Sequence, residues 1–372
     1  MSDKSFFSVS FALIKRDEAI PYDLYINSSS IKNKQKFIKI YPSGEVLHKA
    51  DLEEFKEKYL QLYVDETQRK IYMDSLVSSS DVAGSDKANF IKDSTIQYLH
   101  KIFDDEKKFT TEILEETIGE CRGAVESMVD VLDDYNINSM TGLIGDLSTH
   151  DFYTFDHSIN VSMYCITILR ALKPNASRDE LVHVGLGGLL HDLGKTKIPT
   201  NILNSPGGLT DEEYTEIKKH PKFGIDLLTS GELQVADDLD LNIIGRVVHE
   251  HHENWDGNGY PNKIGGKDIH LYARICTIAD FFDAITTKRS YSDVLPISQA
   301  LSVMNKFSGI KLDPNLFKAF AAHIEHRKIT NKDDLKLADS FDPTIPYEKL
   351  PLEEVKKMFD EENFGKIRIA GD

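Results

Sequence analysis

The chain of 372 residues is long enough for two or three domains, and its 40% apolar and 28% charged residues are typical of a soluble globular protein. Its formal net charge of −17 argues against a surface for nucleic acid or an anionic membrane, because either would need a basic face. Small anionic substrates are compatible with this charge if cations are concentrated at one site.

The cysteines and the N-terminus indicate a cytoplasmic protein. Cys121, Cys165 and Cys276 are scattered, odd in number and without a CxxC pair, which suits a reducing cytosol and offers no thiolate metal site. Apolar and polar residues alternate from Phe7 to Phe11 with the period of a strand, so this segment is not interpreted as a signal peptide. No apolar run approaches the length that crosses a membrane.

Residues 1–90 are predicted to form a small α+β domain with an accessory or regulatory role. The segments FFSVSFALI, YDLYI and KFIKIY have the residue types of short strands, and DLEEFKEKYLQLY predicts an amphipathic helix beginning at Asp51. The domain has no nucleotide-binding glycine loop and no cluster of catalytic residue types. A module that contacts a signalling partner and a packing scaffold both stay open.

The rest of the chain is predicted to be helical. Residues 91–145 are polar and free of proline, so we expect connecting helices that could also pair two chains as a homodimer. Residues 146–330 read as consecutive helices and hold most of the histidines, whereas residues 331–372 are charged and look peripheral. The expected fold class is therefore mainly α, an all-helical bundle with a small N-terminal α+β domain.

An adjacent His-Asp pair lies in the apolar segment LVHVGLGGLLHDLGKTKIP. Gly187 and Gly188 would let another helix approach closely, and Gly194 is predicted to end the helix just after His191-Asp192. A phosphate-binding loop is excluded, because five residues separate Gly188 from Gly194 where that motif needs four. The imidazole and the carboxylate can instead bind one metal cluster, in which the two carboxylate oxygens can bridge two ions.

Helical phase separates the three histidines of HEHHENWDGNGYP. Val247 and Val248 belong to an apolar helix face, and His251 and His252, four residues further on, extend that face inward. His249 falls on the solvent side. Two adjacent inward histidines either bond to backbone carbonyls or bind a metal, and we favour a metal because neutral imidazole is the commonest protein ligand for transition metals.

Three further residues are candidates for the same site. His157 shares a helix face with apolar residues, and His220 closes a helix that opens with a capping box. Asp280 lies in an otherwise apolar helix, where an unpaired carboxylate would be costly. Each is individually more typical of a structural residue. With the residues above they supply five histidines and two carboxylates, enough for two six-coordinate metal sites completed by water.

This pattern resembles the HD phosphohydrolase superfamily in His157, His191-Asp192 and Asp280. The continuation HDLGK…HP…HHENWDGNGYP…IADFFDAITTKRSY is similar to the HD-GYP family of cyclic di-GMP phosphodiesterases, whose signature is Gly259-Tyr260-Pro261 here. The resemblance covers about residues 146–327, roughly half of the chain, and implies an all-helical HD-type bundle.

The resemblance implies a binuclear metal centre in which Asp192 is shared. One ion would be bound by His157, His191, Asp192 and Asp280, and the other by Asp192, His220, His251 and His252. His249 is outside the family pattern, in agreement with its helical phase. A histidine-rich, thiolate-free and six-coordinate site suits iron or manganese better than structural zinc, so we expect two divalent ions of this kind per chain.

The resemblance also implies contacts with the substrate. Lys195 and Arg289 would hold phosphate oxygens, and Tyr260 lies in the loop that shapes the substrate pocket. Trp255 is a candidate for stacking on a guanine, although a lone tryptophan beside a helix end more often packs against the protein.

Two positions depart from the family pattern. Tyr153 stands where some members carry a glutamate that helps to bind a third metal, and Ser292 stands where a second basic residue is usual. The first departure favours two ions over three, and the second weakens the expected grip on the second phosphate.

The expected function is hydrolysis of cyclic di-GMP to linear pGpG, and then to GMP if the reaction continues. A hydroxide bridging the two metals would attack in line, Asp192 would hold both ions, and Lys195 would stabilise the developing negative charge. Two alternatives stay open: the same chemistry on another cyclic dinucleotide, and a receptor that binds cyclic di-GMP without effective catalysis.

Overall fold

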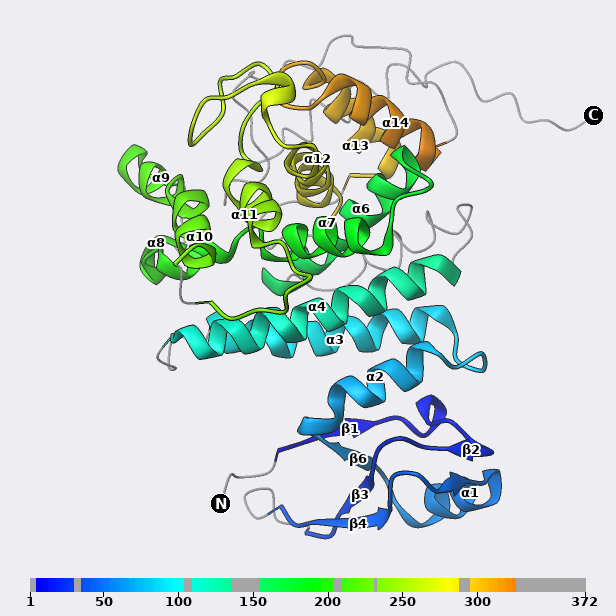
Figure 1. Ribbon diagram of the computed structural model, residues 1–372. Coiled ribbons are helices and arrows are strands. Elements are labelled where there is room, and N and C mark those ends of the chain that lie inside the picture. Colours follow the sequence, from blue (N-terminus) through cyan, green and yellow to red (C-terminus); the bar gives the residue numbers. More distant parts are fainter. Residues whose placement is uncertain are drawn as a thin grey trace, which may run out of the picture. The chain divides into compact units, whose positions relative to one another are not determined.

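The computed structural model describes residues 5–29, 35–103, 109–134, 154–203, 209–230, 233–287 and 295–325. The chain divides into two compact units, Met1–His100 with Gly119–Ile137, and Lys101–Ile118 with Asn138–Asp372. Helices dominate the described elements, and the strands all lie near the N-terminus (Figure 1). The predicted fold class is confirmed. The domain boundaries predicted at residues 90, 145 and 330 stay predictions.

The first unit contains a four-stranded antiparallel sheet in the order β1-β6-β3-β4. Its strands are β1 (Phe6–Val9), β3 (Leu24–Asn27), β4 (Phe37–Tyr41) and β6 (Leu62–Asp65). A separate antiparallel pair consists of β2 (Glu18–Ala19) and β5 (Val46–Leu47). The first predicted strand stops at Val9, because the Ser10 hydroxyl accepts a hydrogen bond from the Ala12 N–H and begins the 3-10 turn η1 (Phe11–Leu13).

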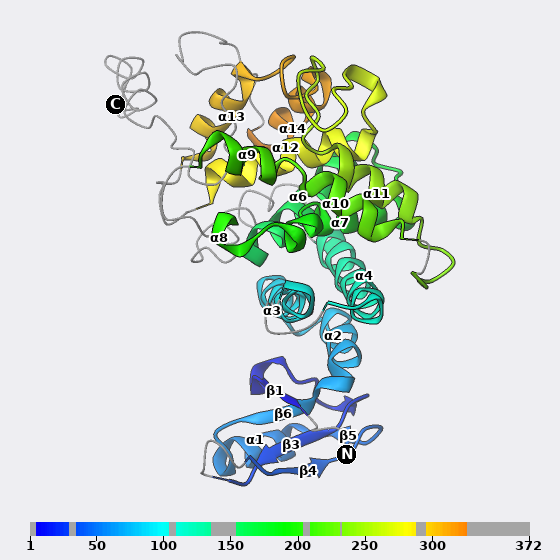
Figure 2. The same cartoon turned by 90° about the vertical axis from the view of Figure 1, so that its left-hand side faces the viewer.

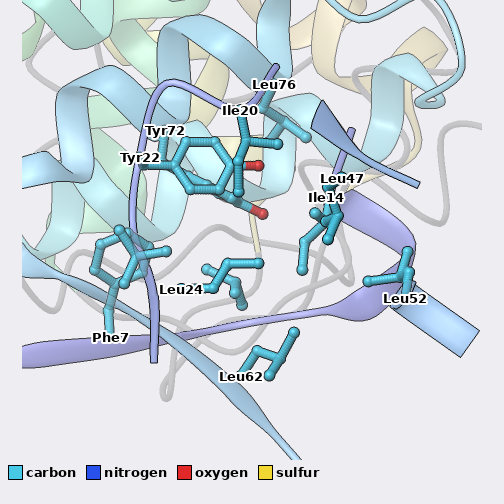
Figure 3. Packing of buried hydrophobic residues seen from close by; sticks show 12 residues of the cluster. Phe7, Ile14, Ile20, Tyr22, Leu24, Leu47, Leu52, Leu62, Tyr72 and Leu76 are labelled. Carbon is cyan, nitrogen blue, oxygen red and sulfur yellow. The ribbon is translucent and has the colours of Figure 1, made fainter. Parts of the chain in front are cut away.

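Two helices complete the core of this sheet, α1 (Lys49–Lys58) and α2 (Arg69–Val77), the latter preceded by the 3-10 turn η2 (Glu66–Gln68). Buried side chains from the strands, from Leu52 of α1 and from Tyr72 of α2 pack together (Figure 3). The helix predicted to begin at Asp51 begins at Lys49, since the Asp51 carboxylate accepts a hydrogen bond from the His48 N–H in a capping box. It is also shorter than predicted, because its last predicted residues belong to β6.

The two longest helices that the structure describes are α3 (Gly84–Phe103) and α4 (Thr111–Asp134). They lie side by side in both views (Figures 1 and 2), and an ion pair of 2.9 Å joins Lys101 of α3 to Glu116 of α4. Helices were predicted for this part of the chain, although α3 begins earlier than expected. Within the described ranges, no helix has both the length and the apolar character needed to cross a bilayer.

The second unit is built around three helices that pack on one another, α6 (Thr154–Leu172), α7 (Arg178–Leu190) and α12 (Leu271–Thr286). On α7 lies α11 (Leu241–Glu250), which also contacts α10 (His220–Leu228). The remaining described elements are η4 (Leu193–Lys197), α8 (Thr200–Leu203), α9 (Asp211–Ile217), η5 (Gly266–Asp268), α13 (Ile297–Lys306) and α14 (Pro314–Glu325).

Glycines set the closest approaches between these helices. A Cβ atom on Gly187 would lie 2.9 Å from the Val247 side chain of α11, and one on Gly188 would lie 2.9 Å from the Cys165 Sγ of α6. These contacts confirm the close helix approach predicted for the glycine pair. The prediction for Gly194 is wrong: α7 already ends at Leu190, and Gly194 lies within η4, where a Cβ atom would be 1.9 Å from the backbone carbonyl oxygen of His220.

Candidate metal centre

The structure brings all seven predicted ligand residues together in the second unit. The ligand atoms form two groups, and within each group they all lie within 4.8 Å of one another. The first group consists of His157, His191 and Asp192, and the second of Asp192, His220, His251 and His252. Asp280 adjoins the first group, since its Oδ1 lies 3.1 Å from the Nε2 of His157. Asp192 belongs to both groups, which is the arrangement a bridging carboxylate requires.

Helix ends position most of these side chains. His191 is the C-cap of α7 and Asp192 precedes η4, while His251 is the C-cap of α11. The sequence had suggested that His220 closes the preceding helix. This is wrong, because α9 ends at Ile217 and His220 is the first residue of α10. Gly194 allows η4 to press against α10, and this contact brings Asp192 to His220, with 3.3 Å between Oδ1 and Nε2.

Backbone carbonyls fix the orientation of three imidazoles. The Nδ1 atoms of His191, His220 and His251 lie 2.7, 2.8 and 2.9 Å from the carbonyl oxygens of Gly188, Ile217 and Val248. A carbonyl oxygen only accepts hydrogen bonds, so each Nδ1 must carry the proton. In the neutral ring each Nε2 therefore presents a lone pair to the centre of the site, as a metal ligand does.

These lone pairs face other acceptors instead of donors. The Nε2 atoms of His220 and His251 are 3.3 Å apart, and the Oδ1 of Asp192 is 3.3 Å from the first and 4.0 Å from the second. Among the described residues, the buried Nε2 of His191 and the buried Oδ1 atoms of Asp192 and Asp280 have no hydrogen-bond partner. Acceptors converging in a buried space are unfavourable unless a cation lies between them, so the donor set fits metal ions.

The pKa values agree with this arrangement. Burial lowers the pKa of His220 to about 4 and lowers the pKa values of His251 and His252 well below their usual range, so these rings are neutral. Burial alone would raise the pKa of Asp192, but the neighbouring His191 ring and Lys195 ammonium outweigh it and hold this pKa well below its usual value. Neutral imidazoles around an ionised carboxylate are the protonation states that metal binding needs.

The buried carboxylate of Asp283 fixes the orientation of the His157 ring. The His157 Nδ1 lies 2.7 Å from the Oδ2 of Asp283, whose Oδ1 accepts hydrogen bonds from the Asn160 amide and the Thr287 hydroxyl. Burial lowers the pKa of His157, but the neighbouring carboxylates of Asp280 and Asp283 outweigh it and raise this pKa to about 9. Asp283 was not predicted as a site residue, although the signal that identified Asp280, a carboxylate in an apolar helix, applies to it equally.

Replacing Asp283 with asparagine is expected to lower metal affinity about tenfold or more, because a charged partner that orients a metal-binding histidine usually contributes 10- to 100-fold. Metal content after dialysis against graded chelator concentrations measures this effect. The fold should be retained, since asparagine keeps an oxygen for the His157 N–H. Unchanged affinity would show that the charge of Asp283 is irrelevant to the site.

Lys195 lies directly against the shared carboxylate. Its Nζ is 2.6 Å from the Oδ2 of Asp192. Lys195 lies three residues after Asp192, and the 3-10 helix η4 brings the two side chains together. The ammonium group is half-buried. Any phosphate oxygen that approached the Asp192 carboxylate would therefore meet this cation at the same place.

The loop after His252 folds back over the metal centre. The Tyr260 ring stacks on the His252 ring, with 4.7 Å between centroids and 28° between planes, and the bond from Tyr260 to Pro261 is cis. Gly259 is required there, since a Cβ atom would lie 2.2 Å from the Asn254 backbone nitrogen. The buried carboxylate of Glu253 accepts hydrogen bonds from the N–H groups at residues 262 and 264, so it closes the loop. The sequence had not singled out this glutamate.

Two predicted features lie away from the ligand atoms. His249 is half-buried and contacts the Pro221 carbonyl and the Asn262 side chain, in agreement with its expected place outside the cluster. The Trp255 ring faces the Arg274 guanidinium at 5.8 Å, and the backbone N–H of Trp255 donates to the Lys311 carbonyl. Stacking of Trp255 on a base stays a prediction.

Three predicted positions fall outside the described residues. They are the phosphate-binding candidate Arg289 and the two departures from the family pattern, Tyr153 and Ser292.

Comparison with known proteins agrees with this site. Residues 143–316 match the family model described as the HD domain, so this part of the chain is an HD domain. A cyclic di-GMP phosphodiesterase of Pseudomonas aeruginosa is 37% identical over 184 residues, which are 49% of this chain and 42% of that protein. A 3'3'-cGAMP-specific phosphodiesterase of Vibrio cholerae is 32% identical over 167 residues, 45% of this chain and 31% of that protein.

The chain thus matches less than half of the length of these relatives. Among solved structures, an HDG"Y"P protein from Bdellovibrio bacteriovorus has a TM-score of 0.52 at 18% identity, covering 85% of this chain and 98% of that one. At this identity the likeness supports the fold alone. It extends beyond the HD domain, since the domain match covers only residues 143–316, which are less than half of the chain.

Proposed function

We propose that this protein is a metal-dependent phosphodiesterase that hydrolyses cyclic di-GMP to linear pGpG and onward to GMP. The observation that carries the proposal is the shared carboxylate of Asp192, which belongs to two groups of inward-facing ligand atoms. We further propose two ions per chain, iron or manganese, held by the two predicted ligand sets. When bound, such a pair of ions lowers the pKa of a bound water and neutralises charge on phosphoryl oxygens.

The protein's own residues supply binding and orientation. Asp192 and the four histidines that flank it form a rigid, buried floor, because their rings are fixed by backbone carbonyls or by stacking. Lys195 would stabilise the negative charge that develops on the phosphoryl oxygens, since its ammonium lies beside the same carboxylate. Tyr260 covers one ring of this floor and would limit the access of water from the loop side.

A second candidate substrate is 3'3'-cGAMP. Three relatives from Vibrio cholerae that are 31–33% identical are named as 3'3'-cGAMP-specific phosphodiesterases, whereas others are named for cyclic di-GMP. Both compounds place a phosphodiester between two purine nucleosides, so the metal centre alone does not discriminate between them. Discrimination would depend on contacts with the bases.

The test is to incubate the metal-loaded full chain with cyclic di-GMP, 3'3'-cGAMP and cyclic di-AMP, and to separate the products by chromatography. We expect faster conversion of cyclic di-GMP, with pGpG as the first product. Faster conversion of 3'3'-cGAMP would replace the proposed substrate by the second candidate. Tight binding of cyclic di-GMP without product, at full metal content, would support a receptor instead of an enzyme.

The N-terminal part of the chain is proposed to have a regulatory role. Residues 1–90 would contact a signalling partner, and residues 91–145 would transmit the signal or pair two chains as a homodimer. The well-packed core around Tyr72 supports an independently folded module for this role. A cytoplasmic location is part of the same proposal.

A further inference from the structure

Lys218 is a cation beside the candidate active site that has no carboxylate partner in the described part of the chain. It is the C-cap of α9, two residues before the candidate ligand His220. Its Nζ lies 4.0 Å from the centroid of the Tyr214 ring and 5.8 Å from that of the Tyr260 ring. The second of these rings stacks on His252, so one side chain connects the Lys218 ammonium to the metal centre.

Neighbouring lysines are arranged differently. Lys219 forms an ion pair with Glu216, and Lys222 forms one with Asp226 at 2.5 Å. Both of these lysines are exposed, whereas Lys218 is half-buried against aromatic rings. In a chain with a net charge of −17, a partly buried cation that contacts aromatic rings, and no carboxylate among the described residues, keeps its charge available for an anion.

The second cation of the site, Lys195, has a different position. It is paired with Asp192 at the shared carboxylate, where the phosphate undergoing hydrolysis would lie. Lys218 lies instead beyond the Tyr260 ring, at the edge formed by α9 and the loop after His252. Two cations at two places match a substrate with two phosphate groups, because a cyclic dinucleotide carries its phosphodiesters on opposite sides of one ring.

We propose that Lys218 binds the phosphate of the cyclic dinucleotide that is not being hydrolysed. This inference rests on the proposed function and goes beyond it by assigning the second phosphate to a residue. An ammonium group binds phosphate as a point charge, so its contribution falls with ionic strength. Lys218 therefore acts on substrate binding and not on the chemical step.

A purely structural role is the competing explanation. Three acidic residues occupy the first turn of α9, and a lysine at the opposite end favours the helix through its dipole. Packing against the Tyr214 ring would serve the same purpose. A structural role would affect every substrate equally, whereas a contact with the second phosphate affects only substrates that possess one.

The experiment compares Lys218→Met with the matched control Lys219→Met in the metal-loaded full chain. Lys218→Met keeps an unbranched apolar side chain over Tyr214 and is expected to raise the KM for cyclic di-GMP on the order of tenfold, with kcat unchanged. Turnover of bis(p-nitrophenyl) phosphate, which has one phosphate, should be unchanged. Lys218→Arg should restore most of the affinity, and Lys219→Met should behave as the wild type.

Ionic strength gives a second measurement. The KM of the wild type for cyclic di-GMP should rise more steeply with salt than that of Lys218→Met. An unchanged KM in Lys218→Met, or an equal loss with both substrates, would overturn the role of Lys218 while the proposed function stands. A wild type that hydrolyses bis(p-nitrophenyl) phosphate but no cyclic dinucleotide would overturn both proposals.

Discussion

His220→Ala is expected to lower the metal content from two ions per chain to one or fewer and to reduce hydrolysis of cyclic di-GMP by at least about 10³-fold, since metal ions contribute several kcal/mol to such reactions. The reason is geometric. The buried Nε2 of His220 lies 3.3 Å from both the Asp192 carboxylate and the His251 ring, so its removal takes a ligand atom from the middle of that group.

The matched control is His249→Ala, which removes an imidazole two residues before His251. The His249 ring is half-buried and contacts Pro221 and Asn262 but none of the clustered ligand atoms. Elemental analysis should use protein purified without chelator or a histidine tag. Loss of metal from the His249 variant with retention in the His220 variant would contradict the ligand assignment. A wild type with three tightly held ions, or with one, would contradict it as well.

Helical periodicity was enough to predict that His251 and His252 point inward and that His249 does not. The stripe that includes Val247 and Val248 placed His251 and His252 inward, and the structure places both rings in one cluster. The signal was strong because burial on a helix recurs with a fixed period, and because imidazoles are rarely buried without a partner. The same reasoning gave His157 its inward orientation, whereas Asp280 was identified as a carboxylate within an apolar helix.

Contacts between distant segments could not be predicted in this way. Gly194 looked like a helix terminator, yet its role is to let η4 approach the carbonyl of His220, which lies 26 residues away in sequence. Glu253 was missed for the same reason, since its importance depends on the backbone of a loop. Asp283 has the same sequence signal as Asp280, but its contact with His157 is known only from the fold. The partner of a buried carboxylate can be identified only from the fold that brings the two groups together.

The N-terminal sheet shows the limit for strands. The alternation of apolar and polar residues correctly located β1, but the residue at which this strand ends depends on the hydrogen bond of the Ser10 hydroxyl. The strand β6 begins within the last residues of a predicted helix. Short strands bury few residues each, so local pattern specifies them weakly and pairing decides their bounds. Tyr63 pairs with Ser8 on one side and with Tyr25 on the other, and this register follows from strand pairing and not from the local sequence.

Lys195→Ala is expected to retain both metal ions and the fold but to lose turnover on the order of 10²-fold, the magnitude typical of removing one electrostatic stabiliser. The ammonium lies 2.6 Å from the Asp192 carboxylate, at the place where the phosphoryl oxygens gain negative charge. Its loss should therefore appear in kcat, whereas loss of Lys218 should appear in KM. This contrast separates a group that acts in the transition state from one that acts in binding.

Lys197→Ala is the matched control, because Lys197 belongs to the same 3-10 helix η4 but is exposed, with its ammonium over the Phe109 ring. It should keep wild-type turnover. Metal content must be measured for each variant, since Lys195 also helps to hold the Asp192 pKa low, and its removal could act through metal binding. If Lys195→Ala loses metal in proportion to activity, Lys195 supports the ligand Asp192. If kcat is unchanged at saturating substrate and full metal content, Lys195 has no part in the chemical step.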